Sequence, residues 1–370
     1  MTMRRSLLMV ISIALAVALI VLLIRIGKVD LHLTFQQLKS VSLIAFAKIL
    51  LLNALMIYLS TEKWRSIDAA WRRPSDSVPP RSTSYALTSV GLAMGIFLPL
   101  QLAMATARTL GTYVHGRALK RGTAGTLLEQ GFDVYMVGFL AVASGITWYF
   151  HGGARIWAIC ASASMVLALL AVEPSVRIIR WLAARLNAPP SGPFNRILHS
   201  VRELQHSGIL NAGLARRLVA LSALRTGTVV LMSFQTARAV GLHIPFWQMA
   251  AAVPFVSVVT IVAVTPGGIG LNDLAGAGAL DVFGTSFAIG AQWVLANRVL
   301  VSASYLFVAA FATVAVCVVR IAQPKQVNGM VESERWAPLF LSLCPSITVR
   351  NSSARHSVAH ATNFATGLSL

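Results

Sequence analysis

Long apolar stretches with few charges place the strongest constraint on how this chain can fold. Nine of them, each 17 to 24 residues long, follow one another along the chain. A helix needs about 20 apolar residues to cross the hydrocarbon core of a bilayer, where backbone must satisfy its own hydrogen bonds. None of the stretches alternates apolar and polar residues as barrel strands do. The sequence therefore predicts an all-α, polytopic membrane helical bundle with candidate spans Ser6–Ile24, Val41–Ser60, Tyr85–Ala107, Leu127–Phe150, Ile156–Val172, Leu218–Ala237, Phe246–Val264, Leu274–Ala296 and Val299–Val319.

The composition excludes a soluble globular protein. Apolar residues make up 56% of the chain and charged residues 12%, with a mean hydropathy of +0.71. Soluble domains carry about 25% charged residues, which they need to cover a water-facing surface. The net charge of +19 would suit nucleic acid, but many Lys and Arg residues lie in short loops between the apolar stretches. Such loops are basic because they stay in the cytoplasm and face anionic headgroups, so we expect membrane lipids as partners and no nucleic acid.

The two ends of the chain differ in character. Arg4 and Arg5 precede a long apolar stretch with no A-x-A-like cleavage site, so we interpret it as a first transmembrane helix and not as a signal peptide. The chain after Arg320 is polar and rich in Ser. We expect residues 1–322 to form the membrane domain and residues 323–370 to form a poorly ordered tail.

The distribution of Lys and Arg favours eight crossings over nine. If Tyr85–Ala107 enters and leaves the membrane on one side, 20 of the 31 Lys and Arg residues lie on that side and six on the other. Nine full crossings separate the charges less well, and cytoplasmic loops carry the excess. We therefore expect about 8 transmembrane helices plus one or two re-entrant or broken helices, with both termini cytoplasmic. A full span kinked at its proline is the alternative for Tyr85–Ala107.

Two segments contain residues that interrupt a helix. Pro99 lies in the middle of Tyr85–Ala107, where it removes a backbone donor and crowds the preceding turn. The segment V-T-P-G-G-I-G-L-N-D contains four residues that favour irregular backbone, and then an acid, namely Pro266, Gly267, Gly268, Gly270 and Asp273. Interrupted segments in corresponding places of two halves point to a transporter binding site near the middle of the membrane.

Charged residues inside apolar stretches are functional candidates, because a charge in a membrane is costly. Glu129 and Asp133 are four residues apart and share one helix face, which we expect to point inward toward a basic partner. The available cations are Arg108, Arg225 and Arg298. Two interpretations stay open. Either an Arg holds a lipid phosphate while the acids orient it or change protonation, or buried ion pairs fix the helix packing.

Motifs of soluble enzymes are missing from the sequence. The segment P-G-G-I-G is not followed by G-K-[ST], and neither G-x-S-x-G nor H-E-x-x-H occurs. Cys160, Cys317 and Cys344 have no metal-ligand spacing. We therefore expect no enzyme activity, no metal and no cofactor.

The motifs occur in the order of a known family. They are a Trp-Arg pair, an L-P motif followed by Arg, an acidic pair at a helix start, a P-G-G-x-G motif followed by an acid, and a late Arg. The matching residues are Trp64, Arg65, Leu98, Pro99, Arg108, Glu129, Asp133, Pro266, Gly267, Gly268, Gly270, Asp273 and Arg298. Between Arg4 and Arg320 the chain resembles the lysylphosphatidylglycerol synthase transmembrane region, a flippase-like integral membrane family. It departs from the family where Leu100 and Ala103 replace small residues or Gly, Gln130 replaces Arg, and Asp273 replaces Glu.

The resemblance implies a bacterial inner-membrane protein that moves an anionic, isoprenoid-linked or glycolipid substrate between leaflets. In the longer synthases this region is joined to a soluble aminoacyl-transfer domain, and only about fifty residues follow Arg320 here, so we expect no lysyl transfer. The alternatives are an intramembrane lipid-headgroup transferase and a non-catalytic accessory subunit of an envelope lipid or polysaccharide pathway. Association as a homo-oligomer or with an envelope-synthesis partner stays open.

Overall fold

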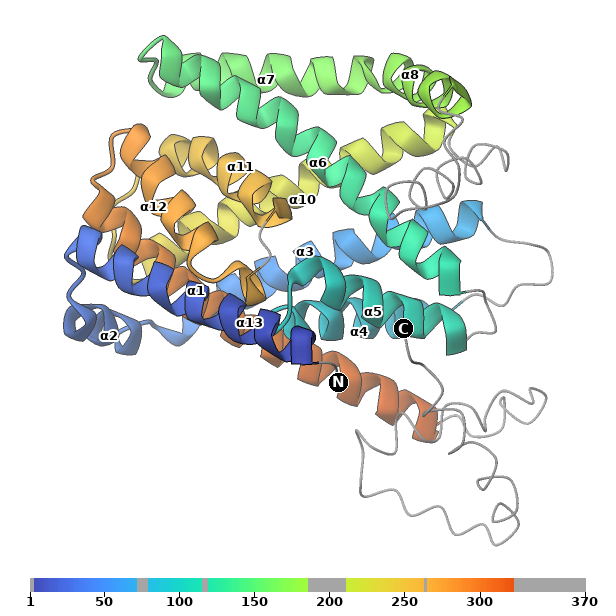
Figure 1. The fold of residues 1–370 in the computed structure, drawn as a ribbon, viewed down its shortest axis with the longest axis horizontal. Helices are drawn as coiled ribbons and strands as arrows, with labels where there is room; N and C mark the ends of the chain where they lie inside the picture. Colours follow the sequence, from blue (N-terminus) through green and yellow to red (C-terminus); the bar gives the residue numbers. More distant parts are fainter. Residues whose placement is uncertain (1–2, 72–78, 115–118, 186–210, 263–264, 323–370) are drawn as a thin grey trace, which may run out of the picture. The chain divides into compact units, whose positions relative to one another are not determined.

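The computed structural model describes residues 3–71, 79–114, 119–185, 211–262 and 265–322, all within a compact unit that runs from Met1 to Ala322. The predicted tail, residues 323–370, lies outside the described residues. Every regular element in the described ranges is helical, as predicted (Figure 1). The elements are α1 (Met3–Gly27), α2 (Leu31–Lys39), α3 (Leu43–Ala70), α4 (Arg81–Met94), α5 (Leu100–Val114), α6 (Leu119–Tyr149), α7 (Ala154–Leu170), α8 (Val172–Arg185), α10 (Ala212–Ala239), α11 (Phe246–Val262), η1 (Pro266–Gly268), α12 (Leu271–Val282) and α13 (Phe287–Ala322).

Several helices are long and apolar enough to cross a membrane. Within the described part of the chain these are α3, α6, α10 and α13, and the bent pair of α7 and α8 makes a fifth if it is one span. Shorter apolar helices occur in α1 and α11. Large apolar side chains such as Leu51, Leu170 and Phe311 lie exposed on these helices, as expected of surfaces that face lipid. The structure thus supports a multi-pass membrane protein and does not confirm the count of eight spans.

The first predicted break separates two short helices that fold back on each other. α4 ends before Gly95, and α5 begins directly after Pro99, whose carbonyl accepts the first helical hydrogen bond from Ala103. A Cβ at Gly91 would lie 3.1 Å from the Cβ of Ala107, and Gly111 abuts Leu87, so the two helices run antiparallel. At about 1.5 Å per residue, neither helix reaches across a bilayer core of about 30 Å. Here the chain forms a helical hairpin and not one kinked helix.

The second predicted break forms a similar hairpin from α11 and α12. A Cβ at Gly276 of α12 would lie 3.6 Å from Cγ2 of Val256 of α11, which places the two short helices side by side. The predicted span Leu274–Ala296 is wrong, because it is divided between α12 and α13, whereas Phe246–Val264 contains one apolar helix of 17 residues, α11. α12 ends at a turn in which Gly284 has a φ of +94°. Such left-handed backbone favours Gly and terminates the helix there.

The last helix is longer than predicted. α13 has 36 residues and passes through Arg298 without interruption, so this Arg does not open a separate span. The side chain of Asp281 instead marks the start of α13, because its Oδ1 accepts a hydrogen bond from the N–H of Phe287 at 3.0 Å. The polar pair Asn297–Arg298 resembled a loop in sequence. It continues the helix because Arg298 has an acidic partner on a neighbouring helix.

The tips of the two hairpins meet. The N–H of Gly267 donates a hydrogen bond to the carbonyl of Leu98 at 3.2 Å. Gly267 has a φ of +59°, and a Cβ at this position would lie 2.8 Å from the carbonyl oxygen of Ile96. The contact therefore requires Gly both for its backbone conformation and for the close approach. The two breaks, far apart in sequence, form one irregular backbone region.

The first hairpin is held by an apolar core in which Leu92 of α4 and Met104 of α5 pack with Met56, Ile57 and Val308, and two further cores share α10. The larger core joins α3, α10, α11, α12 and α13 through buried side chains that include Ile49, Met232, Met249, Leu280 and Trp293. The other core joins α6, α7, α8 and α10, with Met136, Ala168, Val176 and Val219 among its members. These cores bring residues of α3, α6 and α10 to the inner side of the first hairpin.

Candidate functional site

Two adjoining cavities lie beside the hairpins. The first has a volume of about 250 Å³, and its walls come from α3, α4, α5, α6, α10, α11 and α13. The second has a volume of about 230 Å³ and lies against the tip of the second hairpin, at Gly267. The two share wall residues, among them Leu92, Met232, Trp293, Asn297 and Tyr305. Together they form one region with two compartments, in which charged and amide side chains stand among apolar ones.

An Arg–Glu pair forms the wall of the first compartment. Arg108 of α5 and Glu129 of α6 are almost fully buried, and both guanidinium Nη atoms of Arg108 contact the carboxylate. The Nη2 atom also lies 3.4 Å from the carbonyl oxygen of Ser60, and the guanidinium stands over the ring of Trp64 at 5.5 Å. A buried charge is tolerated only with partners of this kind, so the pair fixes α5 against α6.

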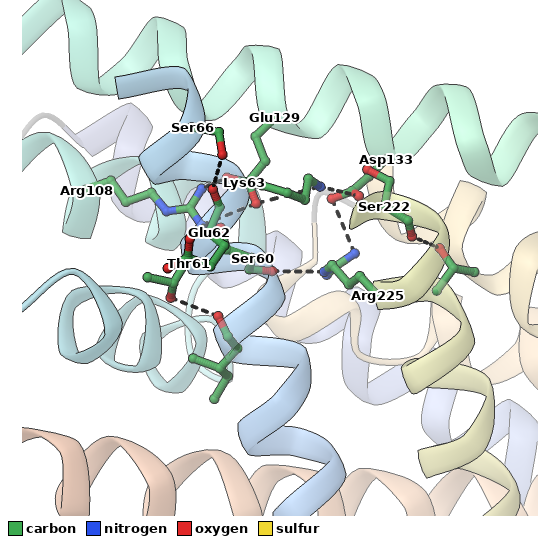
Figure 2. A network of polar contacts seen from close by, with 12 residues as sticks. Ser60, Thr61, Glu62, Lys63, Ser66, Arg108, Glu129, Asp133, Ser222 and Arg225 are labelled. Atoms are coloured by element: carbon green, nitrogen blue, oxygen red, sulfur yellow. Dashed lines mark hydrogen bonds and ion pairs between the residues drawn. The ribbon is translucent and has the colours of Figure 1, made fainter. Parts of the chain in front are cut away.

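Three further charges extend this pair into a cluster, shown in Figure 2. Lys63 Nζ lies 2.5 Å from Asp133 Oδ1 and 3.8 Å from Glu129 Oε1. Arg225 Nη1 lies 3.3 Å from Asp133 Oδ2, and Arg225 Nε donates to Ser60 Oγ at 3.0 Å. Counted over the described residues, the cluster holds three cations and two acids. Its formal charge is therefore +1.

Lys63 could not be identified as a candidate from its sequence position, because it follows the predicted span Val41–Ser60, where a basic cytoplasmic loop is expected. The second apolar stretch was taken to end at Ser60, but α3 continues to Ala70, and the side chain of Lys63 is fully buried. The helical spacing of Ile57, Ser60, Trp64 and Ile67, all buried, continues the inner face of the helix past the last apolar run. That spacing was the available signal.

A second ion pair closes the loop of the second hairpin. Arg298 of α13 binds Asp273 Oδ1 through Nε at 3.1 Å and through Nη2 at 2.8 Å. Its Nη1 also donates to the carbonyl of Gly267 at 3.2 Å. Asp273 Oδ2 accepts from the N–H of Gly270 at 2.8 Å and so caps α12. The pair thus binds the backbone of Gly267 and Gly270, both of which have a positive φ.

The structure thus brings the predicted candidates together in two groups. Arg108, Glu129, Asp133 and Arg225 form the cluster of the first compartment, where the expected basic partners of the acids are Arg108 and Arg225. Arg298 instead pairs with Asp273, beside Gly267, Gly268 and Gly270. Pro99 lies next to the tip contact at Leu98, and Pro266 opens η1. No group of three His, Cys, Asp or Glu side chains able to hold a metal occurs among the residues that the structure describes.

Comparison with known families gives a match over most of the chain. Residues 9–311 match the family described as "Lysylphosphatidylglycerol synthase TM region". The chain belongs to this family. The match covers both hairpins and both ion-pair groups, and the family assignment implies a role connected with membrane lipids. No curated protein and no solved structure matches the chain.

Proposed function

We propose that this member of the lysylphosphatidylglycerol synthase transmembrane family moves an anionic, isoprenoid-linked or glycolipid molecule between the leaflets of a bacterial inner membrane. The observation that carries the proposal is the buried cluster of Lys63, Arg108, Glu129, Asp133 and Arg225, which has one more cation than acid among the described residues. Four of the five side chains line the first cavity. An excess buried cation calls for an anion, and a lipid phosphate is the anion that a membrane supplies.

The hairpin tips support transport as the kind of activity. Irregular backbone at membrane depth is tolerated where protein or a water-filled cavity surrounds it. Broken helices that meet beside such a cavity are the usual frame of a transporter site, because the freed backbone groups can face a polar substrate. Here the contact from Gly267 to Leu98 lies at the second compartment. A headgroup would move past this contact while its acyl chains stay in lipid.

The orientation of the proposed path follows from the charge distribution. The charge distribution predicts that both termini lie in the cytoplasm, and the first hairpin would then enter from the cytoplasmic side. Three candidate spans among the described residues, α6, the bent pair of α7 and α8, and α10, separate the two hairpins, so the second would enter from the opposite side. The tips would then meet within the membrane, and neither an enzyme activity nor a cofactor is part of this proposal.

The proposal can be tested in cells. A deletion strain is complemented with the wild-type chain or with Arg225→Gln, and the lipids of each leaflet are quantified after labelling with a reagent that does not cross the membrane. We expect one anionic lipid to be depleted from its outer leaflet in the deletion strain and restored only by the wild type. An unchanged leaflet distribution would contradict transport. Loss of a modified lipid from both leaflets would instead support the alternative of a headgroup transferase.

A further inference from the structure

The second compartment carries polar groups that lack partners, and they indicate what its ligand offers. The side-chain amide oxygens of Asn272 and Asn297 are buried there, and within the described structure neither has a hydrogen-bond partner. A buried polar atom without a partner destabilises the fold, so such an atom in a cavity wall calls for a ligand donor. Both atoms are acceptors, which an O–H or N–H group of a ligand would satisfy.

The charge of this compartment distinguishes a neutral O–H donor from the N–H donor of a cationic amine. Its charged side chains among the described residues are Asp273 and Arg298, and these pair with each other, so the compartment is neutral overall. In the first compartment the acids Glu129 and Asp133 are already bound by cations in excess. A cationic amine entering either compartment would therefore find no free acid. A hydroxyl group is neutral and needs no acidic partner.

The remaining walls suit a hydroxylated group. Trp293 and Tyr305 line both compartments, and the indole of Trp293 is held in place because its Nε1 donates to the carbonyl of Ser233 at 3.1 Å. Fixed aromatic faces pack against the C–H faces of a polyol, while neighbouring amides bind its hydroxyls. Asn297 lines both compartments, so one ligand can reach it from the charged cluster.

The first compartment supplies the complementary donor. Arg108 Nε is buried and has no hydrogen-bond partner among the described residues. Arg225 lines the same cavity and is about one quarter exposed. Two guanidinium groups with remaining donors match the oxygens of a phosphodiester.

From this arrangement we infer that the substrate headgroup is a phosphodiester-linked polyol with a net negative charge, and not an aminoacylated, cationic headgroup. Its phosphate binds at Arg108 and Arg225, and its hydroxyls donate to Asn272 and Asn297. The inference rests on the proposed function for the claim that the ligand is a lipid to be moved.

The test measures equilibrium binding and does not need transport. The full chain in detergent is titrated with three lipids of identical acyl chains, and bound lipid is counted by native mass spectrometry. Phosphatidylglycerol carries one negative charge and two hydroxyls. Phosphatidylmethanol carries the same charge and no hydroxyl, and lysyl-phosphatidylglycerol carries a net positive headgroup. We expect phosphatidylglycerol to bind about five- to tenfold more tightly than either of the others.

Variants assign the effect to the amides. Asn297→Leu should lower the affinity for phosphatidylglycerol part of the way to that for phosphatidylmethanol, because Asn272 still accepts one hydroxyl, and should leave the affinity for phosphatidylmethanol unchanged. Asn297→Asp should weaken phosphatidylglycerol and strengthen lysyl-phosphatidylglycerol, because it adds a negative charge to the cavity. Asn53→Leu is the matched control, since Asn53 is a buried amide that bonds Ser304 at 2.6 Å and lines neither cavity. A thermal melt of each variant shows whether it is folded.

Two results would overturn the inference. One is equal binding of phosphatidylglycerol and phosphatidylmethanol to the wild type, and the other is tighter binding of lysyl-phosphatidylglycerol. The proposed function fails in a different way. If the chain selects phosphatidylglycerol in the titration but does not transfer it between leaflets in proteoliposomes, the headgroup assignment stands and the transport proposal falls.

Discussion

The two helical hairpins bring opposite charges to the cavity. In the first hairpin, α5 carries Arg108, which pairs with Glu129 of the following helix. In the second, α12 carries Asp273, which pairs with Arg298 of the following helix. Each hairpin therefore uses its second helix for the charge and the next helix for the partner, with the sign reversed. The likeness of the two halves lies in this arrangement more than in their residues.

The surroundings of the two pairs differ more than the pairs themselves. Arg108 and Glu129 lie among other charged side chains, which leave one positive charge in excess among the described residues. Arg298 and Asp273 contact the backbone of their own loop at Gly267 and Gly270. On the proposed function, the first pair exchanges partners with a ligand anion, whereas the second determines the shape of a loop.

The largest expected effect is all-or-none and concerns the sides from which the hairpins enter. In a chain whose three native cysteines are replaced, Ser82→Cys and Lys120→Cys flank the first hairpin, and His243→Cys and Ser286→Cys flank the second. A thiol reagent that does not cross the membrane should label only the second pair when added outside intact cells. All four should react in permeabilised cells. Labelling of one site of a pair without the other would show a full crossing and remove the hairpin from that position.

The next effect comes from removing one member of the buried cluster. Arg108→Met leaves the buried Glu129 with Lys63 at 3.8 Å as its nearest cation, and we expect a loss of about 3–5 kcal/mol in the free energy of unfolding. Arg108→Met/Glu129→Leu removes both charges and should recover most of that stability. Lipid transfer should stay absent in the double variant. Thermal melting in detergent measures the first effect, and a double variant as active as wild type would make the pair purely structural.

A smaller effect is expected at the tip contact. Gly267→Ala adds both a left-handed φ penalty and a clash with Ile96, whereas Gly241→Ala, at a φ of +75° with open space around it, adds the φ penalty alone. The φ penalty is about 1–2 kcal/mol in each variant. The melting temperature should therefore fall further for Gly267→Ala than for Gly241→Ala. Lipid transfer should slow only in Gly267→Ala. Equal melting and equal transfer in the two variants would show that the tips do not need to touch.

The smallest effect is expected from Arg298→Lys. Lysine keeps the charge that faces Asp273 but loses the planar fork that also binds the carbonyl of Gly267. We expect a stability loss of about 1 kcal/mol and slower transfer, without loss of phosphatidylglycerol binding. A loss of binding as large as in the cluster variants would place the substrate phosphate at Arg298 and reverse the division between the two pairs.

Sequence reasoning recovered the helical class and both breaks, because apolar runs, Pro and clustered Gly act on local backbone. It also found the charges that meet in the cavity, since a charge in an apolar run needs a partner. It failed where a tertiary partner extends a helix past a polar residue. The sequence predicted Lys63 in a loop and Arg298 at the start of a helix. Each instead lies within a continuous helix and pairs with an acid of a neighbouring helix.

The contact between the hairpins could not be predicted from the sequence for a related reason. Gly267 and Leu98 are joined by one backbone hydrogen bond. Because the acceptor is a backbone carbonyl, the residue type at position 98 does not indicate the contact. The amides of Asn272 and Asn297 also carried no signal, because a polar residue beside a helix break is typical of an ordinary turn. Their position in the wall of a cavity became visible only with the fold.

The central claim is that the cavity between the hairpins carries an anionic headgroup across the membrane. It is tested most directly in proteoliposomes that contain tail-labelled phosphatidylglycerol, with a reductant outside that bleaches only the outer leaflet. Wild-type protein should expose nearly all of the label, and the Arg108→Met/Glu129→Leu variant should leave the inner-leaflet half protected, as in protein-free vesicles. The claim would be contradicted if the inner-leaflet label stays protected in vesicles that contain wild-type protein. It would also be contradicted if the folded double variant exposes as much label as the wild type.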